Sequence, residues 1–234
     1  MDPLAVAATA GFLGGRAGAF LDALLEPLAN EIGGELRNRY RAMSGKNVEA
    51  VLNGASEILG DAQQSRNAVP GRILFPLLQS AALDEDATMQ RRWASLLANS
   101  ASTGDANKIL PAFVETLRML TPTQAQMLDW MYGRRSSSEF GHPVWADVER
   151  LELESEFELT KEDYALFASD LERLQLIEPR RDIDTDRRGS DIPMDQLLQL
   201  VVDSWNSRVR YARIGLTTFG IRFVEACSVQ PRIP

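Results

Sequence analysis

The side chains that could carry out chemistry in this chain are few, and they begin with one histidine and one cysteine. His142 stands beside a proline in a polar stretch, whereas Cys227 lies among apolar residues of the last predicted helix. A thiol next to an imidazole could form a nucleophile–base pair. However, a cysteine on an apolar helix face usually packs as a small hydrophobic residue. One cysteine and one histidine also cannot form the usual four-ligand zinc site. We therefore predict neither a thiol nucleophile nor a metal site.

Other catalytic patterns are missing or incomplete. The glycines of residues 11–18 lack the spacing and the preceding strand of a dinucleotide-binding turn, and Gly45-Lys46-Asn47 lacks the flanking residues of a phosphate-binding loop. The serines of residues 133–140 lack the glycines of a nucleophile elbow, so we predict a solvated loop. Five acidic residues crowd together, but general acid–base catalysis needs environments that separate two pKa values, and a charge run is usually a hydrated surface. These are Glu149, Glu152, Glu154, Glu156 and Glu158. We predict a protein that is not an enzyme and needs no cofactor.

The composition is that of an ordinary globular protein, with 234 residues, 44% hydrophobic and 25% charged. A single cysteine excludes an internal disulfide, and no basic region precedes the apolar start, so we predict a cytoplasmic protein without a secretory signal. The net charge of -8 disfavours non-specific binding to nucleic acid, which depends on neutralising phosphates.

The N-terminal stretch of residues 3–25 is apolar and rich in glycine. Its glycines form two overlapping pairs at a spacing of four, which would place a smooth strip on one side of a helix and allow close helix packing. The strip consists of Gly11, Gly14, Gly15 and Gly18. The uncharged part is shorter than the roughly 20 residues that span a bilayer. We therefore favour a buried helix, and contact of residues 3–25 with a membrane is the alternative.

The rest of the chain shows mostly helical periodicity, which predicts a mainly α-helical protein with three regions. Residues 1–62 form an N-terminal helical region, in which Asn47 caps a helix that ends at Gly60. Residues 66–120 form a helical core. In this core Pro76 limits one helix, and acidic residues 84–86 begin the next, whose buried face includes Trp93.

The last region, residues 121–228, predicts a winged-helix-like domain. Thr121-Pro122 begins a helix and Thr160 caps another, which precedes a short strand in LQLIEP. A polar loop, a second strand in VRYARIGL and a helix capped by Thr217 follow. The middle helix of such a domain would lie near residues 144–151. The recognition helix would be residues 161–174, where acidic residues outnumber basic ones, and aspartates largely cancel the arginines of the wing. We therefore favour protein contact or packing over DNA binding for this domain.

Several of these segments together resemble the Abi-alpha (abortive infection alpha) family of bacteria. The resemblance lies in the acidic helix start, the run Trp93-Ala94-Ser95-Leu96-Leu97-Ala98, Pro111-Ala112-Phe113, Leu120-Thr121-Pro122 and the closing stretch from Leu216 to Cys227. It covers about residues 66–228 and implies a role in stopping phage infection. The residues that carry it serve packing and capping, so it implies a fold family and transfers no catalytic residue.

We therefore predict a non-enzymatic anti-phage protein that acts through contacts with a protein partner or through homo-oligomer assembly. One alternative is a membrane-disrupting effector whose N-terminal helix reaches a membrane on activation. A second alternative is a DNA-binding regulator that uses the winged helix.

Overall fold

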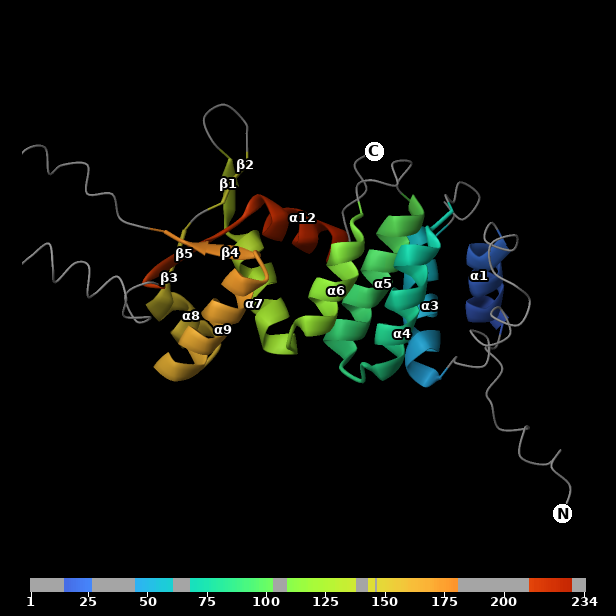
Figure 1. Ribbon diagram of the computed structural model, residues 1–234, viewed down its shortest axis with the longest axis horizontal. Coiled ribbons are helices and arrows are strands. Elements are labelled where there is room, and N and C mark those ends of the chain that lie inside the picture. The colour runs from blue at the N-terminus through green and yellow to red at the C-terminus, as the bar shows by residue number, and fades with distance from the viewer. Residues whose placement is uncertain are drawn as a thin grey trace, which may run out of the picture. The chain divides into compact units, whose positions relative to one another are not determined.

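The computed structural model describes residues 15–26, 45–60, 68–102, 109–137, 143–145, 147–180 and 211–228. Within these residues the protein is mainly helical, as the sequence predicts (Figure 1). The chain divides into two compact units, one made of residues 1–122 and 225–234 and the other of residues 123–224. All described helices of the two predicted regions 1–62 and 66–120 lie in the first unit. The boundaries predicted between the three regions stay a prediction.

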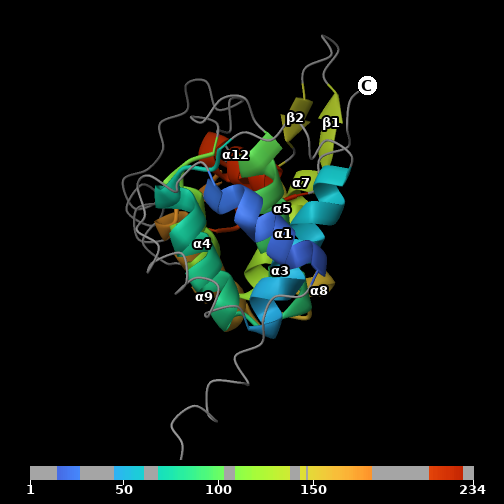
Figure 2. The same cartoon turned by 90° about the vertical axis from the view of Figure 1, so that its right-hand side faces the viewer.

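Helix α5 is the centre of the first unit. The unit consists, in its described part, of α1 (Gly15–Leu25), α3 (Lys46–Leu59), α4 (Gly71–Leu83), α5 (Ala87–Ser102) and α6 (Pro111–Met119). Nearly every residue of α5 from Arg92 to Ala101 is buried, because α3 and α4 both pack against it. Figure 2 shows α1 lying over α3, on which its apolar face is buried. A helix with buried residues on all sides is typical of a core position.

Helices α3 and α5 approach closely where Gly54 faces Ala94. A Cβ atom on Gly54 would stand 3.0 Å from the Cβ of Ala94, tighter than ordinary van der Waals contact. Glycine at this position therefore allows α3 and α5 to pack closely against each other.

Two predictions about helix ends in this unit are wrong. Pro76 does not limit α4, which runs through it, because a stripe of buried leucines and isoleucine outweighs the loss of one backbone hydrogen bond. Asn47 does not cap α3, whose N-cap is Gly45. The Asn47 side chain instead donates to the Ala82 carbonyl oxygen at 3.2 Å and accepts from Gln90 at 3.2 Å. The predicted stop at Gly60 is confirmed, since Gly60 is the C-cap residue and has a φ of 51°.

The second unit places helices on a small antiparallel sheet. In chain order its described elements are α7 (Pro122–Gly133), β1 (Arg135–Ser137), β2 (Pro143–Trp145), β3 (Val148–Glu149), α8 (Arg150–Glu156), α9 (Lys161–Arg173), β4 (Ile177–Pro179), β5 (Arg213–Leu216) and the first part of α12 (Thr218–Cys227). Within the described residues, β5 pairs with β3 on one side and with β4 on the other, so that the strand order is β3-β5-β4.

Residues 133–149 differ from the prediction. Arg135–Ser137 is not a solvated loop but a strand that pairs antiparallel with β2. The predicted helix near residues 144–151 begins later, at Arg150, because Val148 and Glu149 pair with β5. Residues 138–142, which include His142, lie outside the described part of the chain.

The caps predicted in this unit are confirmed. The Thr160 side chain accepts from the Asp163 backbone N–H at 3.1 Å, which ties down the first turn of α9. The Thr217 hydroxyl accepts from the Gly220 backbone N–H at 2.9 Å at the start of α12. Both caps satisfy backbone donors that would otherwise have no partner in the helix.

Candidate functional site

Helices α8 and α9 each expose a leucine side chain to solvent. On α9, four exposed residues recur at helical spacing along one side: Glu162, Leu166, Ser169 and Arg173. We call this stripe the α9 face. Leu166 is 65% exposed, and Leu151 on the neighbouring helix α8 is 62% exposed. Leucine side chains are usually buried, so these two positions differ from the core residues of both helices.

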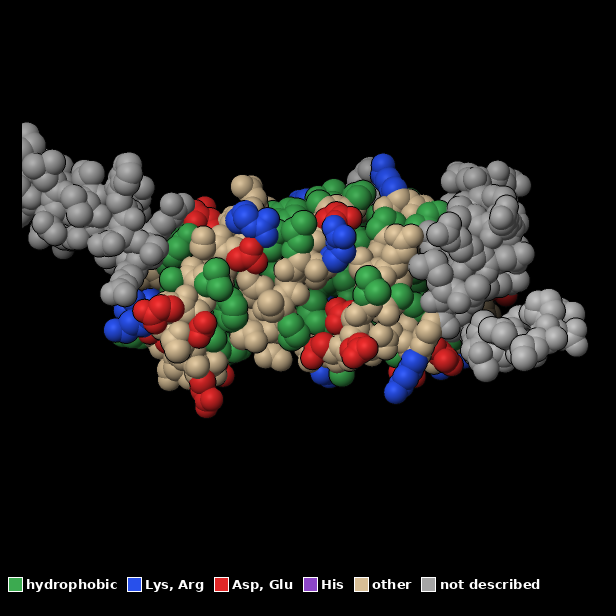
Figure 3. All heavy atoms as spheres, turned by 60° about the horizontal axis from the view of Figure 1, so that its bottom comes forward, with side chains coloured by type: hydrophobic (Ala, Val, Ile, Leu, Met, Phe, Trp, Pro, Cys, Tyr) green, Lys and Arg blue, Asp and Glu red, His purple; other side chains and the backbone are tan. Residues whose placement is uncertain are grey.

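The segment that contains these leucines is acidic. Residues 147–180 contain eleven Asp and Glu and four Lys and Arg, which leaves a charge of -7 in this segment against -8 for the whole chain. The side chains of Glu156, Glu158 and Glu162 are exposed. The space-filling view shows acidic and hydrophobic side chains side by side over this end of the unit (Figure 3). The prediction that the acidic run forms a hydrated surface holds only in part, because the Glu154 side chain is 12% exposed and pairs with Arg150.

The guanidinium of Arg173 on the α9 face forms an ion pair with Asp170 of the same helix. Its Nη2 lies 2.7 Å from Oδ1 of Asp170, and Oδ2 of Asp170 accepts from Gln124 at 3.0 Å. Burial alone would raise the pKa of Asp170, but the hydrogen bonds from Gln124 and Arg173 outweigh burial and lower the pKa below 3.8. Asp170 therefore stays ionised and neutralises the arginine that a DNA-reading helix would present to phosphate.

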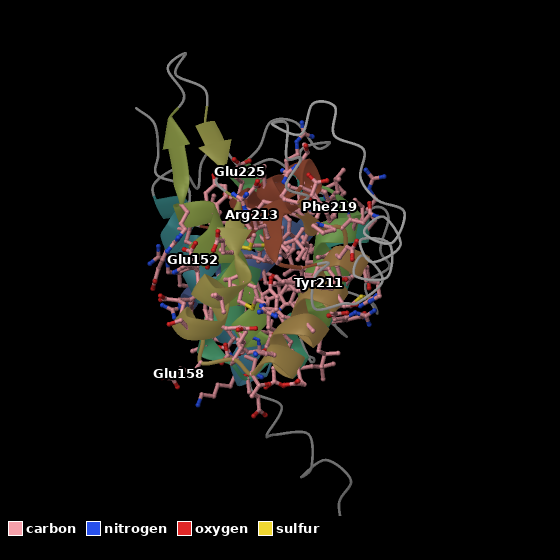
Figure 4. All side chains as sticks on the ribbon, turned by 90° about the vertical axis from the view of Figure 1, so that its left-hand side faces the viewer. Glu152, Glu158, Tyr211, Arg213, Phe219 and Glu225 are labelled. Carbon is pink, nitrogen blue, oxygen red and sulfur yellow. The ribbon has the colours of Figure 1, made fainter. Side chains whose placement is uncertain are left out.

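Behind the α9 face, two tyrosines join α9 to the start of β5. The buried Tyr164 hydroxyl donates to the Tyr211 carbonyl oxygen at 2.8 Å, and the Tyr211 hydroxyl donates to Glu172 at 2.6 Å. Burial raises the pKa of Tyr164, so this phenol stays protonated at neutral pH. Figure 4 shows Tyr211 within the unit and Glu158 at its periphery. Tyr164 acts as a structural donor and is no base or nucleophile.

An ion-pair cluster lies over the middle of the sheet. Arg180 Nε lies 3.0 Å from Asp147, and Arg180 Nη1 lies 2.9 Å from Glu178. A Cβ on Gly215 of β5 would stand 2.6 Å from Arg180 Nε, so glycine leaves room for this guanidinium. Arg180 is therefore paired with carboxylates, which lowers the positive potential beside the predicted wing.

Two acidic residues before α5, Asp84 and Asp86, accept hydrogen bonds that stabilise this helix. Asp86 accepts from the backbone N–H groups of Thr88 and Met89, both at 2.9 Å, and so begins the helix. Asp84 accepts from the indole N–H of Trp93 at 3.0 Å. The sequence predicted acidic residues at the helix start but not the bond to Trp93, since a contact over nine residues of chain leaves no local pattern.

Asn99 is an important polar residue that the sequence reasoning missed. It lies on α5, and its amide donates to carbonyl oxygens at the end of α12, namely those of Ala226 at 2.8 Å, Ser228 at 3.1 Å and Glu225 at 3.4 Å. The last carbonyl groups of a helix have no partner within it, so Asn99 acts as a side-chain cap from another helix. Helix α5 contains several other polar residues, so no signal in the sequence singled out Asn99.

Replacing Asn99 with alanine is expected to lower the free energy of unfolding by about 1–3 kcal/mol, because buried carbonyl groups lose their donor. The measurement is urea denaturation followed by far-ultraviolet circular dichroism. Ser102→Ala on the same helix is the control, since the Ser102 side chain is exposed. Equal midpoints for the two variants would contradict a capping role for Asn99.

The predicted glycine strip is described only in part. Gly11 and Gly14 lie outside the described residues, whereas Gly15 is exposed and Gly18 is half-buried on α1. Arg16, one residue after Gly15, donates from Nε to the Ser56 hydroxyl of α3 at 3.0 Å. A packing role for the strip stays a prediction.

Of the two residues first considered for chemistry, His142 lies outside the described part of the chain and Cys227 lies within it. Cys227 is buried, as predicted. Within those residues no group of three His, Cys, Asp or Glu side chains could hold a metal ion. Among the described helices, none is both long and apolar enough to cross a membrane.

A comparison with protein-family models gives one match. The model described as abortive infection alpha matches residues 46–227, from the first turn of α3 to the end of α12. No curated protein and no solved structure matches the chain. The match covers most of the chain and includes Asp84, Trp93, Asn99 and Gly220.

Proposed function

This chain belongs to the abortive infection alpha family, and from that premise we propose that it is a bacterial anti-phage protein. The family match supports the process, abortive infection, and says nothing of chemistry. We further propose that the protein acts without catalysis, through contacts with other proteins. A fold family is compatible with many activities, so the argument for mechanism must come from individual residues.

The roles of the polar residues in the matched region support a non-enzymatic mechanism. Asp84 accepts a hydrogen bond from the Trp93 indole, Asn99 donates to the end of α12, and the Thr217 hydroxyl caps the start of α12. Catalytic acids and bases usually combine a shifted pKa with a position in a cleft. Each of these polar groups instead has a structural partner that accounts for its presence. The proposal rests on this observation, namely that Asp84, Asn99 and Thr217 each bond to a group of the fold.

We infer that the second unit is a winged helix that binds protein and not DNA. Three features support this inference: the chain order of α7, β3, α8, α9, β4 and β5, the strand order β3-β5-β4, and the position of α9 before the β4–β5 pair. Of the predicted wing, residues 179–193, the structure describes Pro179 and Arg180, and the other residues lie outside the described part. The charge of -7 in residues 147–180 argues against DNA as the partner.

Membrane disruption by the N-terminal segment is the less favoured alternative. In α1, the large apolar side chains Phe20, Leu21 and Leu24 are each 2% exposed or less. Hydrophobic side chains packed in this way are unavailable to a bilayer unless α1 leaves α3. Leakage of dye from anionic liposomes on addition of the full chain would favour this alternative over protein contact.

We expect bacteria that express the chain to release fewer phage while infected cells die. The measurement is plaque formation on a panel of phages, combined with survival of cells infected at high multiplicity. A chain with the destabilising substitution Gly220→Ala, produced at the same level, is the control. Unchanged plaque numbers across the panel would contradict the proposed function, as would protection in which the infected cells survive.

A further inference from the structure

We propose that the α9 face, with Leu166 at its centre, is the docking surface for a basic amphipathic helix of a partner protein. This inference rests on the proposed function, and it adds the surface and the kind of partner. The three observations that carry it are the exposure of Leu166 and Leu151, the helical spacing of the α9 face and the concentration of negative charge around it.

Leu166 has no role in the core of the second unit. The core residues of α9 are Tyr164, Ala168 and Leu171, whereas Leu166 is 65% exposed. Single exposed leucines are common and need no explanation. Here, however, a second leucine on the adjacent helix, Leu151, is exposed to the same degree within the same acidic segment. An apolar anchor with a polar rim is the usual arrangement of a protein-binding surface.

The charge decides which partner fits. Residues 147–180 carry a charge of -7, or -6 when Arg134, which pairs with Glu152, is included, and Asp170 neutralises Arg173 on the α9 face. A polyanion such as DNA, or an anionic membrane, would be repelled from this surface. A partner with lysine and arginine would be attracted to it and bind faster at low salt. The partner must also supply an apolar side for Leu166.

The shape of the surface favours a helix. The α9 face follows a helix of 13 residues, which is about 20 Å long at 1.5 Å per residue. A stripe of this kind, apolar in the middle and charged at its edges, is complementary to a second amphipathic helix laid along it. The partner helix would therefore have apolar residues at a spacing of three to four and basic residues on either side.

The test uses the full chain and a defined probe. The probe is a fluorescein-labelled synthetic peptide of leucine and lysine arranged as an amphipathic helix, and binding is measured by fluorescence anisotropy. A scrambled peptide of the same composition and a labelled DNA duplex are tested alongside. The variants are Leu166→Ser and its matched control Leu83→Ser, because Leu83 is 86% exposed on α4 in the other unit. Circular dichroism checks that both variants keep the fold.

We expect the amphipathic peptide to bind, and Leu166→Ser to weaken binding at least about fivefold while Leu83→Ser leaves it unchanged. Rising salt should weaken binding further, since the attraction is partly electrostatic. Equal affinity of the peptide for both variants, equal affinity for the scrambled peptide, or tighter binding of DNA would each overturn the proposal.

The plaque assay separates this proposal from the proposed function. Leu166→Ser is expected to lose phage protection although it folds, and Leu83→Ser to keep it. Full protection by Leu166→Ser would overturn the docking surface and leave the anti-phage function intact. If the unsubstituted chain gave no protection, the anti-phage function would fail, and the peptide measurements alone would decide the docking surface.

Discussion

Gly220→Ala is expected to destabilise the protein by about 3 kcal/mol or more, or to prevent folding. A Cβ on Gly220 would stand 2.0 Å from the Leu176 carbonyl oxygen, and Leu176 precedes β4 directly. That oxygen is held in place, because it also accepts from the Thr217 backbone N–H at 3.0 Å. A backbone oxygen with a fixed partner cannot move aside as a flexible side chain would.

The measurement is the free energy of unfolding in urea, with soluble yield as a second readout. The control is Gly133→Ala, because a Cβ on Gly133 at the end of α7 meets nothing within 4 Å. Alanine there should leave stability unchanged or raise it slightly, since glycine in a helix is the less stable choice. A Gly220→Ala protein as stable as the Gly133→Ala protein would show that α12 does not pack closely against Leu176.

Local sequence patterns predicted much of this fold. The start of α9 at Thr160, the start of α12 at Thr217 and the end of α3 at Gly60 all follow from residues adjacent in the chain. Caps depend on spacings of three or four residues, which a single sequence shows directly.

The errors have a common physical cause, which is contact between segments distant in the chain. Val148 and Glu149 were included in a helix because their partner strand, β5, lies more than sixty residues away. Proline disfavours a helix locally, which predicts a limit at Pro76, whereas the burial of Leu74 and Leu77 depends on contacts with other helices. Tertiary packing overrides local propensity at such positions.

The candidate surface could be predicted only in part. The acidic character of residues 147–180 is visible in the sequence, whereas the burial of the Glu154 side chain beside Arg150 is not. The sequence predicts a helix over residues 161–174, but the degree to which Leu166 is exposed depends on how that helix packs. Only the packing of α9 shows which apolar residue remains outside.

The polar residues of the matched region fit this view of function. The acidic residues 84–86 before α5 could be taken for catalytic carboxylates. Yet Asp86 caps α5 and Asp84 binds an indole, so the segment is accounted for by helix formation. Among the described residues of α8 and α9, the side chains of Leu151 and Leu166 are exposed and take no part in the core. In a protein that acts through contacts, such a surface is where selection for function is expected to act.

Trp93→Ala is expected to lower the free energy of unfolding by about 3–5 kcal/mol. Trp93 is 1% exposed and lies on α5, the central helix of the first unit. Removing it leaves a cavity that neighbouring helices can close only in part, and it also leaves Asp84 without its indole donor. The effect should reach phage protection as well, because less of the protein would be folded in the cell.

Two further variants separate packing from hydrogen bonding. Trp93→Phe keeps most of the apolar volume but removes the N–H donor, and it should reduce stability by about 1–2 kcal/mol. Arg91→Ala, on an exposed position of the same helix, should change stability by less than about 0.5 kcal/mol. Urea unfolding of the three variants would give the order Trp93→Ala, Trp93→Phe, Arg91→Ala from most to least destabilised. If Trp93→Phe destabilised as much as Trp93→Ala, the hydrogen bond to Asp84 and not the packed volume would dominate at this position, and α5 would owe its place in the core to a polar contact.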